Sequence, residues 1–174
     1  MTNETLYLGA NPLNATATAV EGDYVTRDGE SFYRIANVDG MDDFFISVVS
    51  DSNHWMFIST RGGLSAGRTD CDSALFPYYT EDKICDNSDN TGSRTIVIAD
   101  PDGKRMLWEP FSRSHTGIYS ITRNLYKNVL GDKLIFEETN HDLGLQFSYS
   151  WSTSDRFGFV KQSTIAATGN AESA

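Results

Sequence analysis

A serine between two glycines, in the run Gly63-Leu-Ser65-Ala-Gly67, matches a short motif that carries a nucleophile in hydrolases. In those enzymes the pattern G-x-S-x-G lies on a strained turn between a parallel strand and a helix, which exposes the serine hydroxyl. Here Arg61 and Gly62 precede the motif, and the polar stretch 68–72 follows it. Because neither flank supplies that strand or helix, we expect Ser65 to be noncatalytic and the glycines to allow turns with positive φ.

The motif lies within a 24-residue segment, from Arg61 to Ile84, that has no strand or helix periodicity and is predicted to be one long loop. Such loops are uncommon unless they bind a ligand or contact a partner. Aromatic and charged side chains together could form a sugar site or an interface; alternatively, the charges pair with one another and hold an irregular loop. The candidate residues are Arg61, Arg68, Asp70, Asp72, Tyr78, Tyr79, Asp82 and Lys83, with Trp108 from a later strand.

Other carboxylates lack the arrangement that glycoside cleavage needs, which is an acid on the leaving oxygen and a second carboxylate or a phosphate as attacker. Glu137 and Glu138 are adjacent in a predicted strand, so their side chains point to opposite faces. The run Asp86 to Gly92 departs from a calcium loop because its glycine comes one place late, and the three histidines have no ligand spacing. We therefore expect no metal, no cofactor and no catalysis from this chain alone.

The composition of the chain limits the classes of partner that it is expected to bind. With 24 acidic and 14 basic residues the net charge is −10, which repels phosphate backbones, so no nucleic acid is expected. No run approaches the ~20 apolar residues of a membrane helix, and the first residues lack the features of a secretory signal. We expect a cytoplasmic protein without membrane contact, in which Cys71 and Cys85 are reduced.

Short strands separated by turn signals every 8–12 residues must position these candidates, and they predict an all-β, antiparallel β-sandwich. The clearest alternation runs from Leu143 to Ser152, with large apolar side chains on one face and Gly, Gln and Ser on the other. Residues 1–20 are predicted to be an extended arm and residues 21–174 the sandwich domain. The predicted strands are 23–27, 31–38, 44–50, 54–60, 94–99, 104–108, 118–126, 133–139, 143–152 and 157–165.

Two runs within the predicted loop, Ser-Ala-Gly-Arg at 65–68 and Ala-Leu-Phe-Pro-Tyr-Tyr-Thr-Glu-Asp-Lys-Ile at 74–84, carry a family resemblance. They resemble the N-terminal β-sandwich of large bacterial proteins similar to cellobiose phosphorylase, and the likeness covers roughly residues 40–165. The resemblance implies a galactose-mutarotase-like supersandwich that continues past residue 174. It also implies that the catalytic acid lies in a separate (α/α)6 barrel and that loops of the sandwich support a homodimer.

The predicted function is therefore that of a noncatalytic N-terminal β-sandwich domain of a glycoside phosphorylase-like or hydrolase-like enzyme. Its partners would be other domains of the same polypeptide. One alternative is a stand-alone carbohydrate-binding module that holds an oligosaccharide on Tyr78, Tyr79 and Trp108. A second alternative is a structural β-domain of a cell-surface or phage protein, which would form higher-order assemblies without binding sugar.

Overall fold

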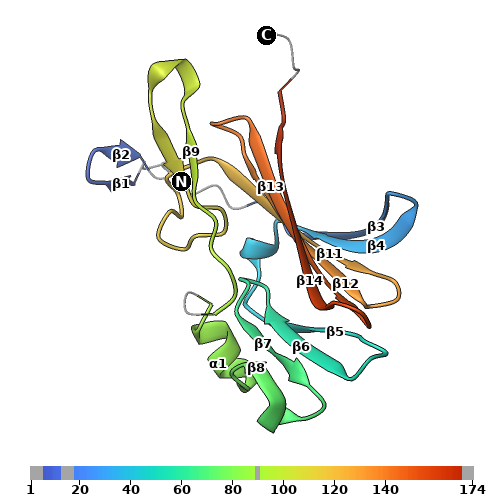
Figure 1. The fold of residues 1–174 in the computed structure, drawn as a ribbon. Coiled ribbons are helices and arrows are strands. Elements are labelled where there is room, and N and C mark those ends of the chain that lie inside the picture. Colours follow the sequence, from blue (N-terminus) through green and yellow to red (C-terminus); the bar gives the residue numbers. More distant parts are fainter. Residues whose placement is uncertain (1–5, 13–17, 89–90, 170–174) are drawn as a thin grey trace.

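The computed structural model describes residues 6–12, 18–88 and 91–169, most of which lie in antiparallel strands (Figure 1). Its only α-helix among these residues is α1 (Glu81–Asp86). The strands are β1 (Tyr7–Leu8), β2 (Asn11–Pro12), β3 (Glu21–Arg27), β4 (Glu30–Ala36), β5 (Phe45–Val48), β6 (His54–Ser59), β7 (Leu64–Arg68), β8 (Ala74–Phe76), β9 (Val97–Ala99), β10 (Met106–Trp108), β11 (Ile121–Asn128), β12 (Lys133–Asn140), β13 (Leu145–Ser154) and β14 (Gly158–Ala167).

Two main sheets form the body of the molecule. The larger has six strands in the order β14-β13-β12-β11-β4-β3, and the smaller has four in the order β5-β6-β7-β8. Figure 1 shows the smaller sheet below the larger one, with the tip of the β9–β10 hairpin projecting away from both. The short β1–β2 hairpin belongs to the region predicted as an extended arm.

The hydrophobic core lies between the two sheets, which confirms the predicted all-β sandwich. The smaller sheet contributes Met56, Ile58 and Leu64, each at most 1% exposed, and the larger contributes Leu134 and Phe136. Along β13 the buried residues are Phe147, Tyr149 and Trp151, as the alternation predicts. No helix in the described ranges is long and apolar enough to cross a membrane.

Local turn signals located the hairpins correctly. Asp28 and Gly29 have φ of 51° and 80°, so this two-residue connection has the pair of positive φ values that a type I′ turn requires. The predicted pairing of 44–50 with 54–60 is confirmed in β5 and β6, although both strands are shorter than predicted.

The predicted long loop from Arg61 to Ile84 is wrong, because the segment contains β7, β8 and most of α1. Leu64, Ser65 and Ala66 are each fully buried, with β6 pairing along β7. A strand that is buried on both faces shows no alternation of apolar and polar residues, so the periodicity argument could not detect it.

A buried carboxylate joins the β10 region to the larger sheet. Glu138 is 1% exposed, and its oxygens accept hydrogen bonds from Trp108 Nε1 at 2.8 Å, Phe111 N at 2.6 Å and Arg123 Nε at 2.8 Å. These donors come from β10, the following segment and β11. Because a buried carboxylate is costly unless it is paired and hydrogen-bonded, these three contacts stabilise Glu138 in the core.

Glu137 faces the opposite side of the larger sheet, as its place in the strand predicts. There it accepts a hydrogen bond from Tyr126 OH at 2.6 Å and pairs with Arg27 at 3.0 Å. Burial, together with the bond to Glu137, raises the pKa of Tyr126 to about 12. The two neighbouring glutamates therefore serve two separate polar clusters.

We expect Glu138→Ala to destabilise the fold by about 3–5 kcal/mol, because it leaves the Arg123 guanidinium buried without its counter-charge. Asp100→Ala is the matched control, since the Asp100–Arg105 pair is 4.0 Å long and both side chains are largely exposed. It should cost less than about 1 kcal/mol. Urea unfolding followed by tryptophan fluorescence gives both values, and equal losses in the two variants would contradict the role of Glu138.

Candidate functional site

Aromatic side chains form a continuous row on the outer face of the smaller sheet. The strand register places Phe45, Phe57 and Trp55 on this face, opposite to core residues such as Met56. Ring centroids are 5.7 Å apart for Phe45 and Phe57, 6.1 Å for Phe57 and Trp55, and 5.7 Å for Trp55 and Tyr78. We call these four residues the aromatic row. Its ends are open to solvent, because Phe45 is 39% and Tyr78 58% exposed.

Trp55 is held in place by two local features of the chain. Its indole Nε1 donates a hydrogen bond to the Asp70 carbonyl oxygen at 3.1 Å. Its ring lies so close to Gly67 that a Cβ atom there would be 2.5 Å from Trp55 Cζ2. Gly67 is not at positive φ, so the expected turn role is wrong here: the glycine allows close approach of the ring.

Ser65 organises the segment that carries Tyr78. Its hydroxyl is fully buried, donates to the Pro77 carbonyl oxygen at 2.8 Å and lies 3.2 Å from Tyr79 N, from which it accepts. A serine in this position is not displayed on a strand-to-helix turn. The motif that resembled a nucleophile site therefore serves to fix the backbone from Pro77 to Tyr79.

The other residues of the predicted loop do not converge on the aromatic row. Arg68 pairs in register with His54, so it lies on the opposite face of the smaller sheet from Trp55. Asp70 caps the turn at 71–73, where its Oδ1 accepts from Ser73 N at 3.1 Å. The sequence therefore predicted a larger cluster than the fold assembles.

Exposure separates the remaining candidates. Asp72 and Lys83 are exposed and Tyr79 is half-buried, whereas the side chain of Asp82 lies outside the described residues. Trp108 is 1% exposed and donates to Glu138, so its ring has no open face for a ligand. The prediction that Trp108 belongs to a binding platform is therefore wrong.

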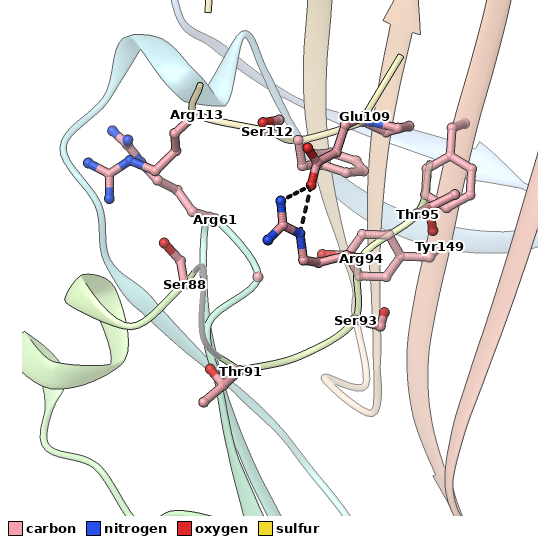
Figure 2. Close-up of a pocket in the computed structure, with 14 residues that line it drawn as sticks. Arg61, Ser88, Thr91, Ser93, Arg94, Thr95, Glu109, Ser112, Arg113 and Tyr149 are labelled. Atoms are coloured by element: carbon pink, nitrogen blue, oxygen red, sulfur yellow. Dashed lines mark hydrogen bonds and ion pairs between the residues drawn. The ribbon is translucent and has the colours of Figure 1, made fainter. Parts of the chain in front are cut away.

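The side chain of Arg61 points away from the other loop residues (Figure 2). It lines a small polar cavity between the two sheets, and we call the contacts around this cavity the polar joint. Arg61 Nε lies 2.5 Å from Asp43 Oδ1, so its partner comes from outside the loop. In the same joint Arg94 pairs with Glu109, at 2.7 Å between Nε and Oε1. Arg113 lines this pocket without an ion pair to any described residue. Among the described side chains, no ion pair links two members of the predicted loop cluster.

The cavity of this joint measures only about 40 Å³. Ligand pockets are typically ~300–1,000 Å³, so this space accommodates water rather than a sugar ring. Tyr149 forms one wall, and burial raises the pKa of its hydroxyl. Lys161 lies 4.6 Å from the centre of the Tyr149 ring, and burial lowers the pKa of its ammonium group. The arrangement is that of a structural contact, which leaves the aromatic row as the stronger candidate for binding.

The fold and this surface define the chain as an all-β sandwich with an aromatic outer face. No family model and no curated protein matches the sequence.

We expect Gly67→Ala to destabilise the protein by about 1–3 kcal/mol, because the added methyl group would overlap the Trp55 ring and the Ala74 backbone. It should also shift the tryptophan emission, since the Trp55 ring must move. Gly169→Ala is the control, because it has open space and no positive φ. Thermal unfolding and emission spectra that match the control would contradict the close approach of Trp55 to Gly67.

Proposed function

We propose that this chain is a noncatalytic β-sandwich domain that assembles with other domains of a cytoplasmic, carbohydrate-active polypeptide of the cellobiose phosphorylase type. The observation that supports it best is an uncovered apolar groove between the two sheets. The groove has a volume of about 360 Å³ and is lined by Tyr33, Ile35, Phe44, Phe45, Ile46, Ser47, Leu125 and Lys127.

The groove arises because the sheets are unequal. Tyr24 and Tyr33 lie on the inner face of the larger sheet, yet Tyr24 is 76% and Tyr33 43% exposed. Inner-face residues of a sandwich are normally covered by the opposing sheet. The smaller sheet therefore does not cover the inner surface of β3 and part of β4.

Further apolar side chains extend this surface at the nearby turns. Val49 follows β5, Val129 and Leu130 lie in the β11–β12 turn, and all three are more than half exposed. Val49 N donates to the Gly131 carbonyl oxygen at 2.8 Å, so the two turns are in direct contact. Contiguous exposed apolar surface of this kind marks sites of contact with another protein surface.

A role in assembly agrees with what the resemblance implies, because a domain that packs on a separate catalytic barrel needs an apolar contact surface. The hydrogen bonds of Ser65 and Glu138 are structural, which agrees with a role in assembly. Cys71 and Cys85 form no disulfide, which suits a reducing compartment. The proposal does not require that the chain bind sugar by itself.

An antibody raised against this domain tests the proposal on a denaturing gel of the source cells. We expect a band several times larger than 19.3 kDa, because the barrel and the remaining domains would be part of the same polypeptide. Recombinant chain on the same gel provides the size control. A native band at 19.3 kDa would rule out assembly with domains of the same polypeptide.

A second function, carbohydrate binding, is favoured by the aromatic row alone. An exposed tyrosine beside a fixed indole offers the apolar surface on which a pyranose ring can stack. We expect cello-oligosaccharides to change the tryptophan fluorescence of the isolated chain, and Tyr78→Ala to weaken the affinity about fivefold.

Tyr24→Ala is the matched control for this titration, because Tyr24 is an exposed tyrosine in β3, outside the aromatic row. It should leave the affinity unchanged. A titration without a saturable change in fluorescence would exclude carbohydrate binding at the aromatic row, and the assembly proposal would then stand alone.

A further inference from the structure

We propose that the free edge of β5 accepts an extended segment of another domain, which becomes a fifth strand of the smaller sheet. The segment is apolar at its centre and carries lysine or arginine at its ends. This inference rests on the proposed role in assembly and specifies how the partner is held.

The backbone of β5 is free to pair at two positions. β5 lies at the end of the order β5-β6-β7-β8, so only one of its sides is occupied by a neighbouring strand. Thr60 N donates to Phe44 O at 2.9 Å, and residues that pair in this way alternate along an antiparallel ladder. Phe44, Ile46 and Val48 therefore direct their N–H and C=O groups toward β6. It follows that Phe45 and Ser47 direct their N–H and C=O groups to the open side.

The next position on this side is already paired. Val49 N donates to Gly131 O, in the β11–β12 turn, and Val49 is the residue that follows Phe45 and Ser47 in the alternation. The contact shows that the free edge beside β5 can form backbone hydrogen bonds in this fold. An added segment would continue the same series along Ser47 and Phe45.

Side chains beside this edge fit the two faces of an incoming strand. Toward the interior it would lie on the groove, where Tyr33, Ile35 and Leu125 provide apolar contacts. Toward the outside it would lie beside Phe45, at the end of the aromatic row. Alternate side chains of a strand point to opposite faces, so the centre of the partner must be apolar on both.

β5 is short, but it lacks the charged residues and prolines that protect other edge strands. Natural edges carry charged residues, proline or bulges, which prevent pairing with other chains. The edge strand β3 contains Glu21, Asp23 and Arg27, and the edge strand β14 contains Lys161. β5 reads Phe-Ile-Ser-Val and has no charged residue. β8, the other edge of the smaller sheet, is also uncharged, but it has only three residues and Pro77 follows it. Among the edges of the two main sheets, β5 is therefore the one best suited to strand addition.

Charge favours a basic partner over a second copy of this chain. The exposed residues Asp42 and Asp51 flank β5, and the whole chain has a net charge of −10. Pairing β5 with the β5 of another copy would bring like charges together at both ends. A segment with lysine or arginine at its ends would instead place opposite charges beside these two aspartates.

A short synthetic peptide tests the inference, with the centre Val-Thr-Val-Ile-Val, paired lysines at each end and a fluorescent label. We expect saturable binding in anisotropy titrations, with amide NMR shifts largest at Phe45 and Ser47. Ser47→Pro removes the outward N–H group and should weaken binding by about tenfold or more. Ser47→Ala keeps this donor and should bind as the wild type does.

Proline is tolerated where the N–H group faces solvent, so Ser47→Pro should fold, as amide spectra will show. If it does not, Tyr33→Glu provides the second variant, because it places a charge in the groove and should also weaken binding. Equal affinity for the wild type and Ser47→Pro, or for the wild type and Tyr33→Glu, would overturn the inference, as would a lack of saturable binding.

Sedimentation of the chain without peptide tests whether a second copy of the chain occupies the β5 edge instead. A concentration-dependent dimer that Ser47→Pro abolishes would assign the edge to a second copy and overturn the choice of a basic segment. If the native band is several times larger than 19.3 kDa but the peptide does not bind, strand addition fails while the assembly proposal stands.

Discussion

The buried charge of Glu138 is the constraint on which the rest of the sandwich depends. Its carboxylate is stabilised in the core by the donors of Trp108, Phe111 and Arg123. These contacts fix the β9–β10 hairpin and the segment after it against the larger sheet. Phe111 adopts φ of 64°, an unfavourable value for a non-glycine residue, so that its N–H group reaches Glu138.

The same constraint determines the polar joint between the sheets. With its backbone held by Glu138, Phe111 places its ring 5.3 Å from Tyr149, and the chain leads directly into Arg113. Arg123 is fixed as well, because its second guanidinium nitrogen donates to Ser112 O at 3.2 Å. The charged residues near the cavity are therefore explained by the packing of the sandwich, which agrees with the small size of that cavity.

Features set by neighbouring residues could be predicted from the sequence, and features set by distant contacts could not. The Asp28-Gly29 turn and the alternation along β13 are local, and both predictions are confirmed. β7 was missed because the polar Ser65 is buried, and its hydroxyl is satisfied by a backbone segment twelve residues away. In the candidate site Tyr78 was predicted, but its partner Trp55 was not. The position of Gly67 opposite Trp55 could have indicated that the ring lies at this site. That position follows from the strand register, which cannot be assigned until the pairing of the strands is known.

The two sheets differ in size, and this difference places the proposed contact surface at a sheet edge rather than in the segment 61–84 that was predicted to be a loop. Six strands opposed to four leave inner-face tyrosines of β3 and β4 in solvent, and the uncovered surface ends at β5. The aromatic row reaches the same strand from the outside, through Phe45. Apolar surface on both faces thus meets at β5, an edge strand without a charged residue, whereas β3 and β14 carry charges that oppose pairing. The proposed partner site is therefore determined by where the smaller sheet ends, a property of the whole sandwich that no single motif encodes.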